Sequence, residues 1–175
     1  MAEEDAEDDP PGLPPGTPFY MTPMGHAALR AELRKLWDEE RPKVVEVVSW
    51  AAGLGDRSEN ADYQYGKRRL RQIDGRVRFI TKRLGRVQVV DPAAQARRDR
   101  VFFGATVTYA RASDAAEATI TIVGVDEADS AAGRISWVAP MARALLGAQV
   151  GDVRRIRTPA GVEEIEVVDI AYPPA

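Results

Sequence analysis

The sequence predicts an α+β protein in which an antiparallel α-helical coiled-coil hairpin precedes a small β-rich domain. Three observations lead to this class. Apolar residues recur every three or four positions through most of residues 22–87, which is typical of amphipathic helices. A short polar stretch, GLGDRSENADY (53–63), interrupts this pattern. After residue 100 the apolar residues alternate with a period of two, as they do in half-buried strands.

Composition narrows the function classes. The 175 residues are 45% hydrophobic and 29% charged, which indicates a folded chain of one ordinary domain or two small ones. There is no cysteine, so a disulfide framework and a thiolate metal site are excluded, and His26 alone offers almost nothing for a Ser-His-Asp triad. No apolar run approaches the roughly 20 residues of a membrane span, and the acidic start does not resemble a secretory signal. We therefore expect a cytoplasmic protein.

Residues 1–18, MAEEDAEDDPPGLPPGTP, form the first segment. All of its charged residues are Asp or Glu, and prolines follow them. This composition predicts a disordered, solvated tail.

The first predicted helix begins at Thr22 and Pro23, because proline is well tolerated at the first helical position. Pro42 lies inside the apolar pattern and should kink the helix or loosen one turn of it. The apolar stripe, with one polar exception, consists of Leu29, Leu33, Leu36, Glu40, Val44, Val47 and Ala51.

The second predicted helix carries a heptad seam after the polar stretch, and the two helices should pack as an antiparallel hairpin. About 30 residues per arm at 1.5 Å each give a rod roughly 45 Å long, with GLGDRSENADY at its distal tip. We assign the hairpin to residues 19–92 and a linker to 93–100. The seam consists of Leu70, Ile73, Val77, Ile80, Leu84 and Val87.

Residues 101–175 are predicted to form the β-rich domain. Alternating apolar residues over 101–109, 120–122, 135–137 and 165–167 predict a small antiparallel sheet. PMARALLGAQVGD (140–152) predicts one or two helical turns that begin at Pro140 and end before Gly147.

Two explanations fit the Asp56-x-x-Glu59 pair at the tip. The spacing by itself favours a capping-box-like pair that stabilises the N-terminus of the returning helix. Alternatively, the two carboxylates could offer oxygen ligands to Mg²⁺ or hold a water molecule. Two carboxylates alone cannot bind Mg²⁺ tightly, so the tip would then complete a metal site on another molecule.

The second helix is strongly basic. KRRLRQIDGRVRFITKRLGR (67–86) contains nine Lys or Arg against the single Asp74. A solvated helix face is the ordinary explanation of such a run, but the i,i+4 Glu–Lys pairs of a self-stabilised helix are missing. Because the cations project away from the seam as one basic flank, a phosphate backbone is their natural complement.

The tip and second helix, GDRSENADYQYGKRRLRQIDGRVRFITKRL, resemble those of the bacterial Gre transcript-cleavage factors, the GreB branch in particular. LRKLWDEERP in the first arm and VFFGA, PMARALLGAQVGD and TPAG after the linker match as well, so the resemblance covers about residues 20–172 in order. It implies a coiled-coil N-terminal domain and an FKBP-like C-terminal domain, and it does not imply prolyl isomerase activity.

The same resemblance implies how such a protein works. Gre factors bind RNA polymerase at the rim of its secondary channel through the C-terminal domain, and the coiled coil enters the channel. In backtracked complexes the tip carboxylates hold the second catalytic Mg²⁺ and the attacking water, and the polymerase then cuts the extruded RNA. We therefore expect a monomeric accessory factor rather than an enzyme, with Mg²⁺ bound only in the complex.

By motif match, the tip carboxylates are Asp56 and Glu59, and Asn60 and Tyr63 are expected to steady the water or the RNA end. The resemblance also places Pro140 and Met141 in the polymerase-docking loop. The expected RNA-binding residues are Lys67, Arg68, Arg69, Arg71, Arg76, Arg78, Lys82 and Arg83.

Three glycines of the second helix, Gly66, Gly75 and Gly85, depart from the family pattern, which more often has larger polar residues there. Each is expected to cost up to about 1 kcal/mol of helix stability relative to alanine.

Other functions fit the sequence less well. The main alternative is a non-cleaving regulator or inhibitor that occupies the secondary channel on the same scaffold. An interaction or chaperone module built on the FKBP-like domain does not account for the specific tip. A stand-alone nuclease is disfavoured because the chain has too few ligands for two metal ions.

Overall fold

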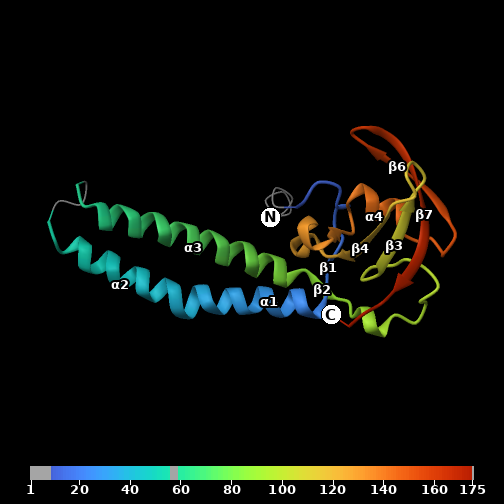
Figure 1. The fold of residues 1–175 in the computed structure, drawn as a ribbon. Helices are drawn as coiled ribbons and strands as arrows, with labels where there is room; N and C mark the ends of the chain where they lie inside the picture. The colour runs from blue at the N-terminus through green and yellow to red at the C-terminus, as the bar shows by residue number, and fades with distance from the viewer. Residues whose placement is uncertain (1–8, 56–58, 175) are drawn as a thin grey trace. The chain divides into compact units, whose positions relative to one another are not determined.

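The computed structural model describes residues 9–55 and 59–174 of the chain. The chain divides into two compact units: a helical hairpin of residues 26–86, and a β-rich unit made of the residues up to 25 together with those from 87 onward (Figure 1). No helix in the described residues is long and apolar enough to cross a membrane. The elements are, in order, β1 (Phe19–Met21), α1 (Pro23–Arg34), the π-helical η1 (Lys35–Glu40), α2 (Arg41–Ala52), α3 (Ala61–Gly85), β2 (Val87–Val89), η2 (Pro92–Ala94), β3 (Thr106–Arg111), β4 (Glu117–Val123), η3 (Val125–Glu127), η4 (Ser130–Ala132), β5 (Arg134–Ser136), α4 (Pro140–Leu145), β6 (Val153–Thr158) and β7 (Gly161–Ala171).

The first arm of the hairpin begins where the sequence predicts. Pro23 is the first residue of α1, and the Thr22 hydroxyl accepts a hydrogen bond from the backbone N–H of Gly25 at 3.1 Å. This bond satisfies one of the free N–H groups of the first turn, so Thr22 acts as the N-cap.

The predicted effect of Pro42 is also confirmed. It stands in the first turn of α2, directly after the six π-helical residues of η1. Because proline has no N–H, it interrupts the α-helical ladder, and the wider π turn accommodates the break. The wider turn also shifts the apolar stripe. Val48 and Ala51 face the seam beyond Val44, whereas Val47, predicted to lie in the stripe, is 46% exposed.

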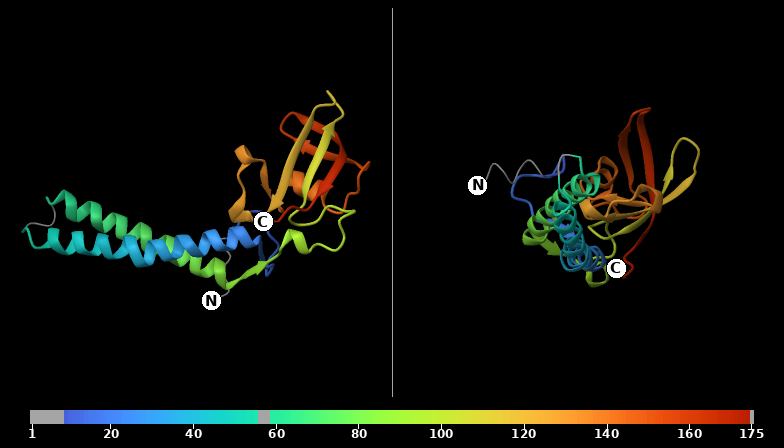
Figure 2. Two further views of the ribbon diagram at one scale, coloured as in Figure 1. Left: turned by 60° about the horizontal axis from the view of Figure 1, so that its bottom comes forward. Right: turned by 90° about the vertical axis from the view of Figure 1, so that its left-hand side faces the viewer.

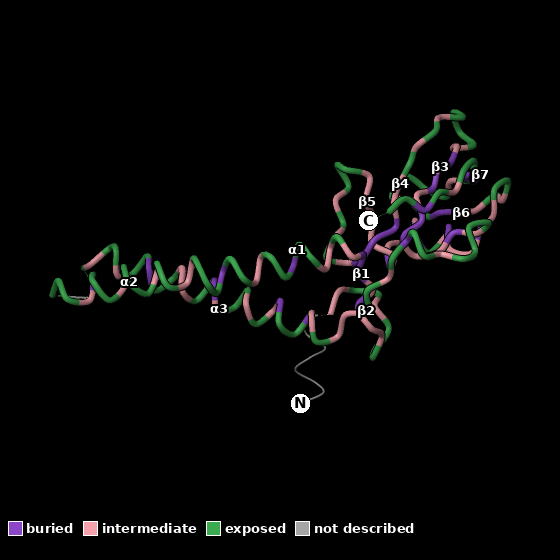
Figure 3. The backbone as a smooth tube through the Cα atoms, turned by 90° about the horizontal axis from the view of Figure 1, so that it is seen from below, coloured by how far each residue is buried: buried purple, intermediate pink, exposed green. Residues whose placement is uncertain are grey.

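Helix α3 packs along the first arm, and Figure 2 shows the two arms side by side in both views. The predicted seam is confirmed within the helix: Ile73 and Ile80 are fully buried, and the neighbouring seam residues are half-buried. Figure 3 shows that burial in the hairpin is confined to isolated positions. The last predicted seam residue, Val87, is not helical, because α3 ends at Gly85 and Val87 begins β2.

The three glycines of α3 have different surroundings. Gly66 is buried, and a Cβ atom added there would lie 2.6 Å from Cγ2 of Val48 on the opposite arm. Added Cβ atoms at Gly75 and Gly85 would meet nothing within 4 Å. Gly66 therefore permits close packing of the two arms, whereas the other two only lower the helix propensity.

This difference predicts opposite effects of two alanine substitutions. Gly75→Ala should raise the free energy of unfolding of the hairpin by up to about 1 kcal/mol, because alanine is the better helix former. Gly66→Ala should lower it by roughly 1–3 kcal/mol, since the β-branched Val48 has little freedom to move away. Urea unfolding followed by circular dichroism at 222 nm measures both. Equal stabilisation by the two substitutions would show that the arms do not pack closely at Gly66.

The β-rich unit includes both ends of the predicted hairpin segment. Strands β1 and β2 form a parallel two-stranded ribbon, in which Phe19 pairs with Val87 and Met21 with Val89. The carboxylate of Glu127 accepts hydrogen bonds from the backbone N–H groups of Thr22 and Gly124 at 3.0 and 2.9 Å, and from the Thr22 hydroxyl. Three-residue strands are too short for a periodic signal, so the predicted hairpin, residues 19–92, is longer at both ends than the observed unit, residues 26–86.

The main sheet has five strands in the order β5-β4-β3-β7-β6. The predicted sheet is confirmed, but its predicted all-antiparallel character is wrong, because β5 pairs with β4 in parallel. Strand β6 was not predicted, since Ile156 is its only buried residue and arginines fill most of its other positions. The predicted alternation from residue 101 begins as a strand only at Thr106, although Val101 and Ala105 are buried.

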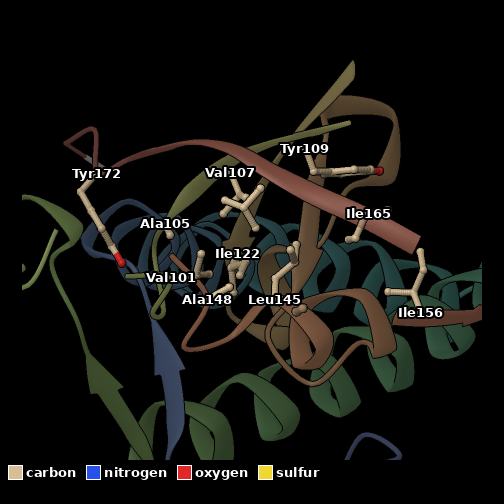
Figure 4. Close-up of a cluster of buried hydrophobic side chains, with 12 residues drawn as sticks. Val101, Ala105, Val107, Tyr109, Ile122, Leu145, Ala148, Ile156, Ile165 and Tyr172 are labelled. Carbon is tan, nitrogen blue, oxygen red and sulfur yellow. The ribbon is translucent and has the colours of Figure 1, made fainter. Parts of the chain in front are cut away.

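One hydrophobic core lies between this sheet and α4 (Figure 4). Helix α4 confirms the predicted helical turns: it begins at Pro140, buries Ala142 and Leu145, and is followed by Gly147 in the left-handed region at φ 82°. The core consists of Val101, Ala105, Val107, Tyr109, Ile122, Ala142, Leu145, Ala148, Ile156, Ile165, Val167 and Tyr172.

Residues 10–17 of the N-terminal segment form turns. Backbone hydrogen bonds close two successive turns, from Leu13 N–H to the Pro10 carbonyl at 3.2 Å and from Thr17 N–H to the Pro14 carbonyl at 3.1 Å. The disorder of residues 1–18 stays a prediction, and residues 1–8 lie outside the described residues.

Candidate functional site: the hairpin tip and the basic face of α3

The polar stretch at the tip joins the end of α2 at Ala52 to the start of α3 at Ala61. Asp56, one of the two predicted carboxylates, lies outside the described residues. Glu59, the other, is fully described, and its side chain is exposed in the turn just before α3.

Asn60 is the residue that caps α3. Its side-chain Oδ1 accepts a hydrogen bond from the backbone N–H of Tyr63 at 3.1 Å, and its Nδ2 donates to the carbonyl of Ala51 at 2.7 Å. One side chain thus satisfies a free N–H at the start of α3 and ties it to the end of α2.

This geometry rules out a capping box in which Asp56 caps α3 and Glu59 is its partner. Because α3 begins at Ala61, the N-cap is Asn60, four residues after Asp56. The sequence spacing placed the helix start too early. The exposed Glu59 carboxylate is therefore not the capping partner that the spacing favoured.

Asn60 and Tyr63 both contact other residues of the hairpin. Both polar groups of Asn60 are engaged within the chain, which makes it a positioning residue for the tip. Tyr63 is half-buried, and the Lys67 ammonium lies 5.6 Å from its ring centroid. The expectation that Asn60 and Tyr63 steady a water or an RNA end stays a prediction.

Replacing Asn60 should therefore loosen the tip. Asn60→Ala removes both hydrogen bonds and is expected to lower the free energy of unfolding of the hairpin by about 1–2 kcal/mol. Asn60→Asp keeps the acceptor for the Tyr63 N–H but loses the donor to Ala51, so it should cost less. Urea unfolding at 222 nm compares the two with the wild type. An alanine variant as stable as the wild type would contradict the capping role.

Seven of the eight basic residues of α3 divide into two rows, and the eighth is Lys67, described above with Tyr63. Arg69, Arg76 and Arg83, spaced by seven, form the inner row. Arg69 contacts Glu40 at 2.6 Å, and Arg76 binds both oxygens of Glu32 at 2.6 and 2.9 Å. Arg83 is only 7% exposed, and its guanidinium lies 4.7 Å from the ring centroid of Phe79.

The inner row explains why α3 lacks internal Glu–Lys pairs: carboxylates of the first arm neutralise part of its charge. In the reverse direction, Arg41 of α2 contacts Asp74 of α3 at 2.8 Å. Arg69 and Arg76 lie in ion pairs within the hairpin, and Arg83 is buried, so none of the three is a freely exposed cation. That these three residues contact RNA stays a prediction.

The Arg76 hydrogen bonds also lower the pKa of the Glu32 carboxyl below its ordinary value of 4.5. A lowered folded-state pKa means that this pair adds stability above the unfolded pKa and loses it as the pH falls through the folded value. The ion pair therefore supports the hairpin at neutral pH.

The outer row consists of exposed cations. Arg68, Arg71, Arg78 and Lys82 fall within an arc of about 80° on a helical projection, opposite the buried Ile73 and Ile80. Within the part of the chain that the structure describes, Arg68, Arg71 and Arg78 have no ion-pair partner. This face presents cations in a line along the helix, which suits a phosphate backbone.

The remaining predicted contacts lie on α4. Pro140 is exposed at the first position of the helix, and Met141 is half-buried against the hydrophobic core. Over residues 9–55 and 59–174, no group of three or more His, Asp or Glu side chains is placed to hold a metal ion.

Comparisons with known proteins agree with this arrangement. The family model "Transcription elongation factor, N-terminal" matches residues 19–89, and "Transcription elongation factor, GreA/GreB, C-term" matches residues 95–172. The chain is 53% identical over 156 residues to transcription elongation factor GreB of Neisseria meningitidis serogroup A, covering 89% of this chain and 95% of that protein. It is 51% identical over 160 residues to GreB of Pseudomonas aeruginosa, covering 91% and 94%.

Among solved structures, the GreA/GreB elongation factor from Nitrosomonas europaea is 22% identical, with a TM-score of 0.40, and covers 89% of this chain and 99% of that one. Together, the two family models cover the hairpin and most of the β-rich unit, and the match to GreB of Neisseria meningitidis covers 89% of the chain. The chain therefore belongs to the GreA/GreB family of transcription elongation factors.

Proposed function

We propose that this protein binds RNA polymerase through its secondary channel and stimulates the polymerase to cleave the RNA 3′ end in backtracked, arrested complexes. The observation that carries the proposal is the exposed carboxylate of Glu59 at the end of the hairpin, next to the Asn60 cap. A carboxylate held at the end of a long arm is suited to act in another molecule's site.

The donor set at the tip is consistent with a shared rather than a private metal site. Two carboxylates, Asp56 and Glu59, supply the hard oxygen ligands that Mg²⁺ prefers, but too few of them for tight binding. When bound between the tip and the polymerase, Mg²⁺ would activate a water molecule for attack on the RNA phosphate. In this proposal Glu59 and Asp56 bind and orient, Asn60 holds the loop, and the polymerase remains the enzyme.

The other surfaces have matching roles. The outer row of α3, with Arg68, Arg71 and Arg78 exposed, would contact the extruded RNA. The exposed start of α4 at Pro140 and Met141 would dock at the rim of the channel on an FKBP-like domain. The protein would act as a monomer in the cytoplasm, where the polymerase is.

The alternative is a regulator that blocks the channel without cleavage. It would need the arm and the docking surface, but it would not need an exposed carboxylate at the tip. Glu59 therefore favours the cleavage factor.

The test is a backtracked elongation complex with labelled RNA, incubated with Mg²⁺ in the presence and absence of the protein. We expect rapid shortening of the RNA from its 3′ end, only when polymerase is present. Cleavage of free RNA would contradict the accessory role. Slower nucleotide addition without cleavage would support the channel-blocking alternative.

A further inference from the structure

The N-terminal segment lies outside the family match, which begins at residue 19. Its second half contains two tandem copies of a four-residue unit, PPGL (10–13) and PPGT (14–17). Six carboxylates precede these copies in the sequence, between residues 3 and 9. The segment is thus a feature of this chain beyond what the family domains account for.

Each copy forms a turn whose geometry follows from its residues. The hydrogen bonds run from the fourth N–H to the first carbonyl, and the third residues, Gly12 and Gly16, have φ angles of +89° and +74°. Proline at the second position and glycine at the third are the residues that a type II turn requires. Because proline already restricts the backbone, ordering this segment against a surface costs little conformational entropy.

The first turn contacts α4. The Gly12 carbonyl accepts a hydrogen bond from the guanidinium of Arg143, and in Figure 1 the segment runs beside α4. A Cβ atom at Gly12 would lie 3.0 Å from Nη2 of Arg143, the mobile end of that side chain, so the φ angle of +89° is what requires glycine here. Added at Gly16, a Cβ atom would meet nothing within 4 Å.

The contact uses the outward surface of α4. Ala142 and Leu145 point into the core, which leaves Pro140 and Arg143 as the exposed residues of the helix. Arg143 is the basic residue on this surface of α4, and its guanidinium donates the hydrogen bond to the Gly12 carbonyl.

We infer that residues 9–16 are an internal ligand of the outer α4 surface and compete with RNA polymerase for it. The inference rests on the proposed function, because it takes α4 to be the docking surface. A segment that covers a binding surface lowers the apparent affinity by the fraction of molecules in which the surface is free. The chain would thus regulate its own entry into the polymerase.

The test measures the Kd for RNA polymerase of the full chain and of three variants: a deletion of residues 1–18, Gly12→Ala and Gly16→Ala. We expect the deletion to tighten binding by about five- to tenfold, the scale of one hydrogen bond. Gly12→Ala should reproduce most of this gain with all the acidic residues still present. Gly16→Ala introduces the same backbone strain without touching Arg143, and it should change the Kd by less than about twofold.

The outcomes separate the inference from the proposed function. Equal Kd values for the full chain, the deletion and Gly12→Ala would overturn the inference and leave the function intact. Weaker binding after deletion would also overturn it, because the segment would then be a polymerase contact. Failure of both the full chain and the deletion variant to bind polymerase would overturn the proposed function itself. Circular dichroism at 222 nm checks that the deletion variant is folded.

Discussion

Replacing Glu59 by glutamine is expected to slow transcript cleavage by at least about 100-fold while leaving the Kd for polymerase nearly unchanged. Glutamine keeps the size of the side chain but removes the charge that would hold Mg²⁺. Because Glu59 is exposed and is not the capping residue of α3, the substitution should not unfold the tip. Asp56→Asn is expected to have the same effect. Single-turnover cleavage of backtracked complexes measures the rate.

Asp62 offers a matched control for this experiment. It is an exposed carboxylate in the first turn of α3, close in sequence to Glu59. Asp62→Asn removes the same charge from the same part of the molecule and should change the cleavage rate by less than about threefold. Equal losses in Glu59→Gln and Asp62→Asn would mean that only the general negative charge of the tip matters.

Neutralising the outer row of α3 should weaken action on long extruded RNA more than on short RNA. The triple variant Arg68→Ala, Arg71→Ala and Arg78→Ala removes three exposed cations, so it should slow cleavage of long extrusions about tenfold and flatten its salt dependence. The stability of the hairpin should stay the same, because these side chains form no ion pairs with the described residues.

The inner row supplies the comparison. Arg69→Ala with Arg76→Ala removes the contacts to Glu40 and Glu32, so it should lower the free energy of unfolding by about 1 kcal/mol, with a smaller dependence on RNA length. Equal loss on long and short RNA in the outer-row variant would indicate that these cations only steer docking. Loss of stability in the outer-row variant would contradict the division into two rows.

Much of the hairpin could be predicted because its signals are local. Thr22 and Pro23 mark a helix start by their own chemistry, and the seven-residue spacing of Ile73 and Ile80 identifies the buried seam. Pro42 also predicts the irregular turn that the structure shows as the π-helical residues of η1. Beyond this turn, Val48 takes the place of Val47 in the apolar stripe. This shift depends on the number of residues in the π turn, which no residue type specifies.

Features that join distant residues could not be predicted. The ion pair of Arg76 with Glu32 spans 44 residues of sequence, so it is invisible to a search for pairs within one helix. From the sequence alone, Gly66 is expected only to lower the helix stability. In the structure it lies so close to Val48 of the opposite arm that a larger residue would not fit without a shift. The parallel pairing of β5 with β4 depends on the path of the chain between them, and that path carries no periodic signal.

At the tip, the motif indicated the residues but misassigned their local roles. Four carboxylate and amide residues lie within GLGDRSENADY, and the spacing favours Asp56 as the cap, whereas Asn60 fills that position in the structure. The Asn60 side chain accepts a hydrogen bond from the Tyr63 N–H in α3 and donates one to the Ala51 carbonyl in α2. It therefore links the two helices, which a capping box within α3 would not do. The structural role of Asn60 could be found only from the fold.

A Mg²⁺ titration of the cleavage rate tests whether the tip shares a Mg²⁺ ion with the polymerase. Rates would be measured in backtracked complexes for the wild type and Glu59→Gln, with the polymerase-only rate subtracted. If Glu59 is a ligand of the shared ion, Glu59→Gln should need more Mg²⁺ for half-maximal rate, and raised Mg²⁺ should restore part of its activity. An unchanged half-maximal Mg²⁺ concentration in Glu59→Gln would show that Glu59 is not a ligand of the shared ion.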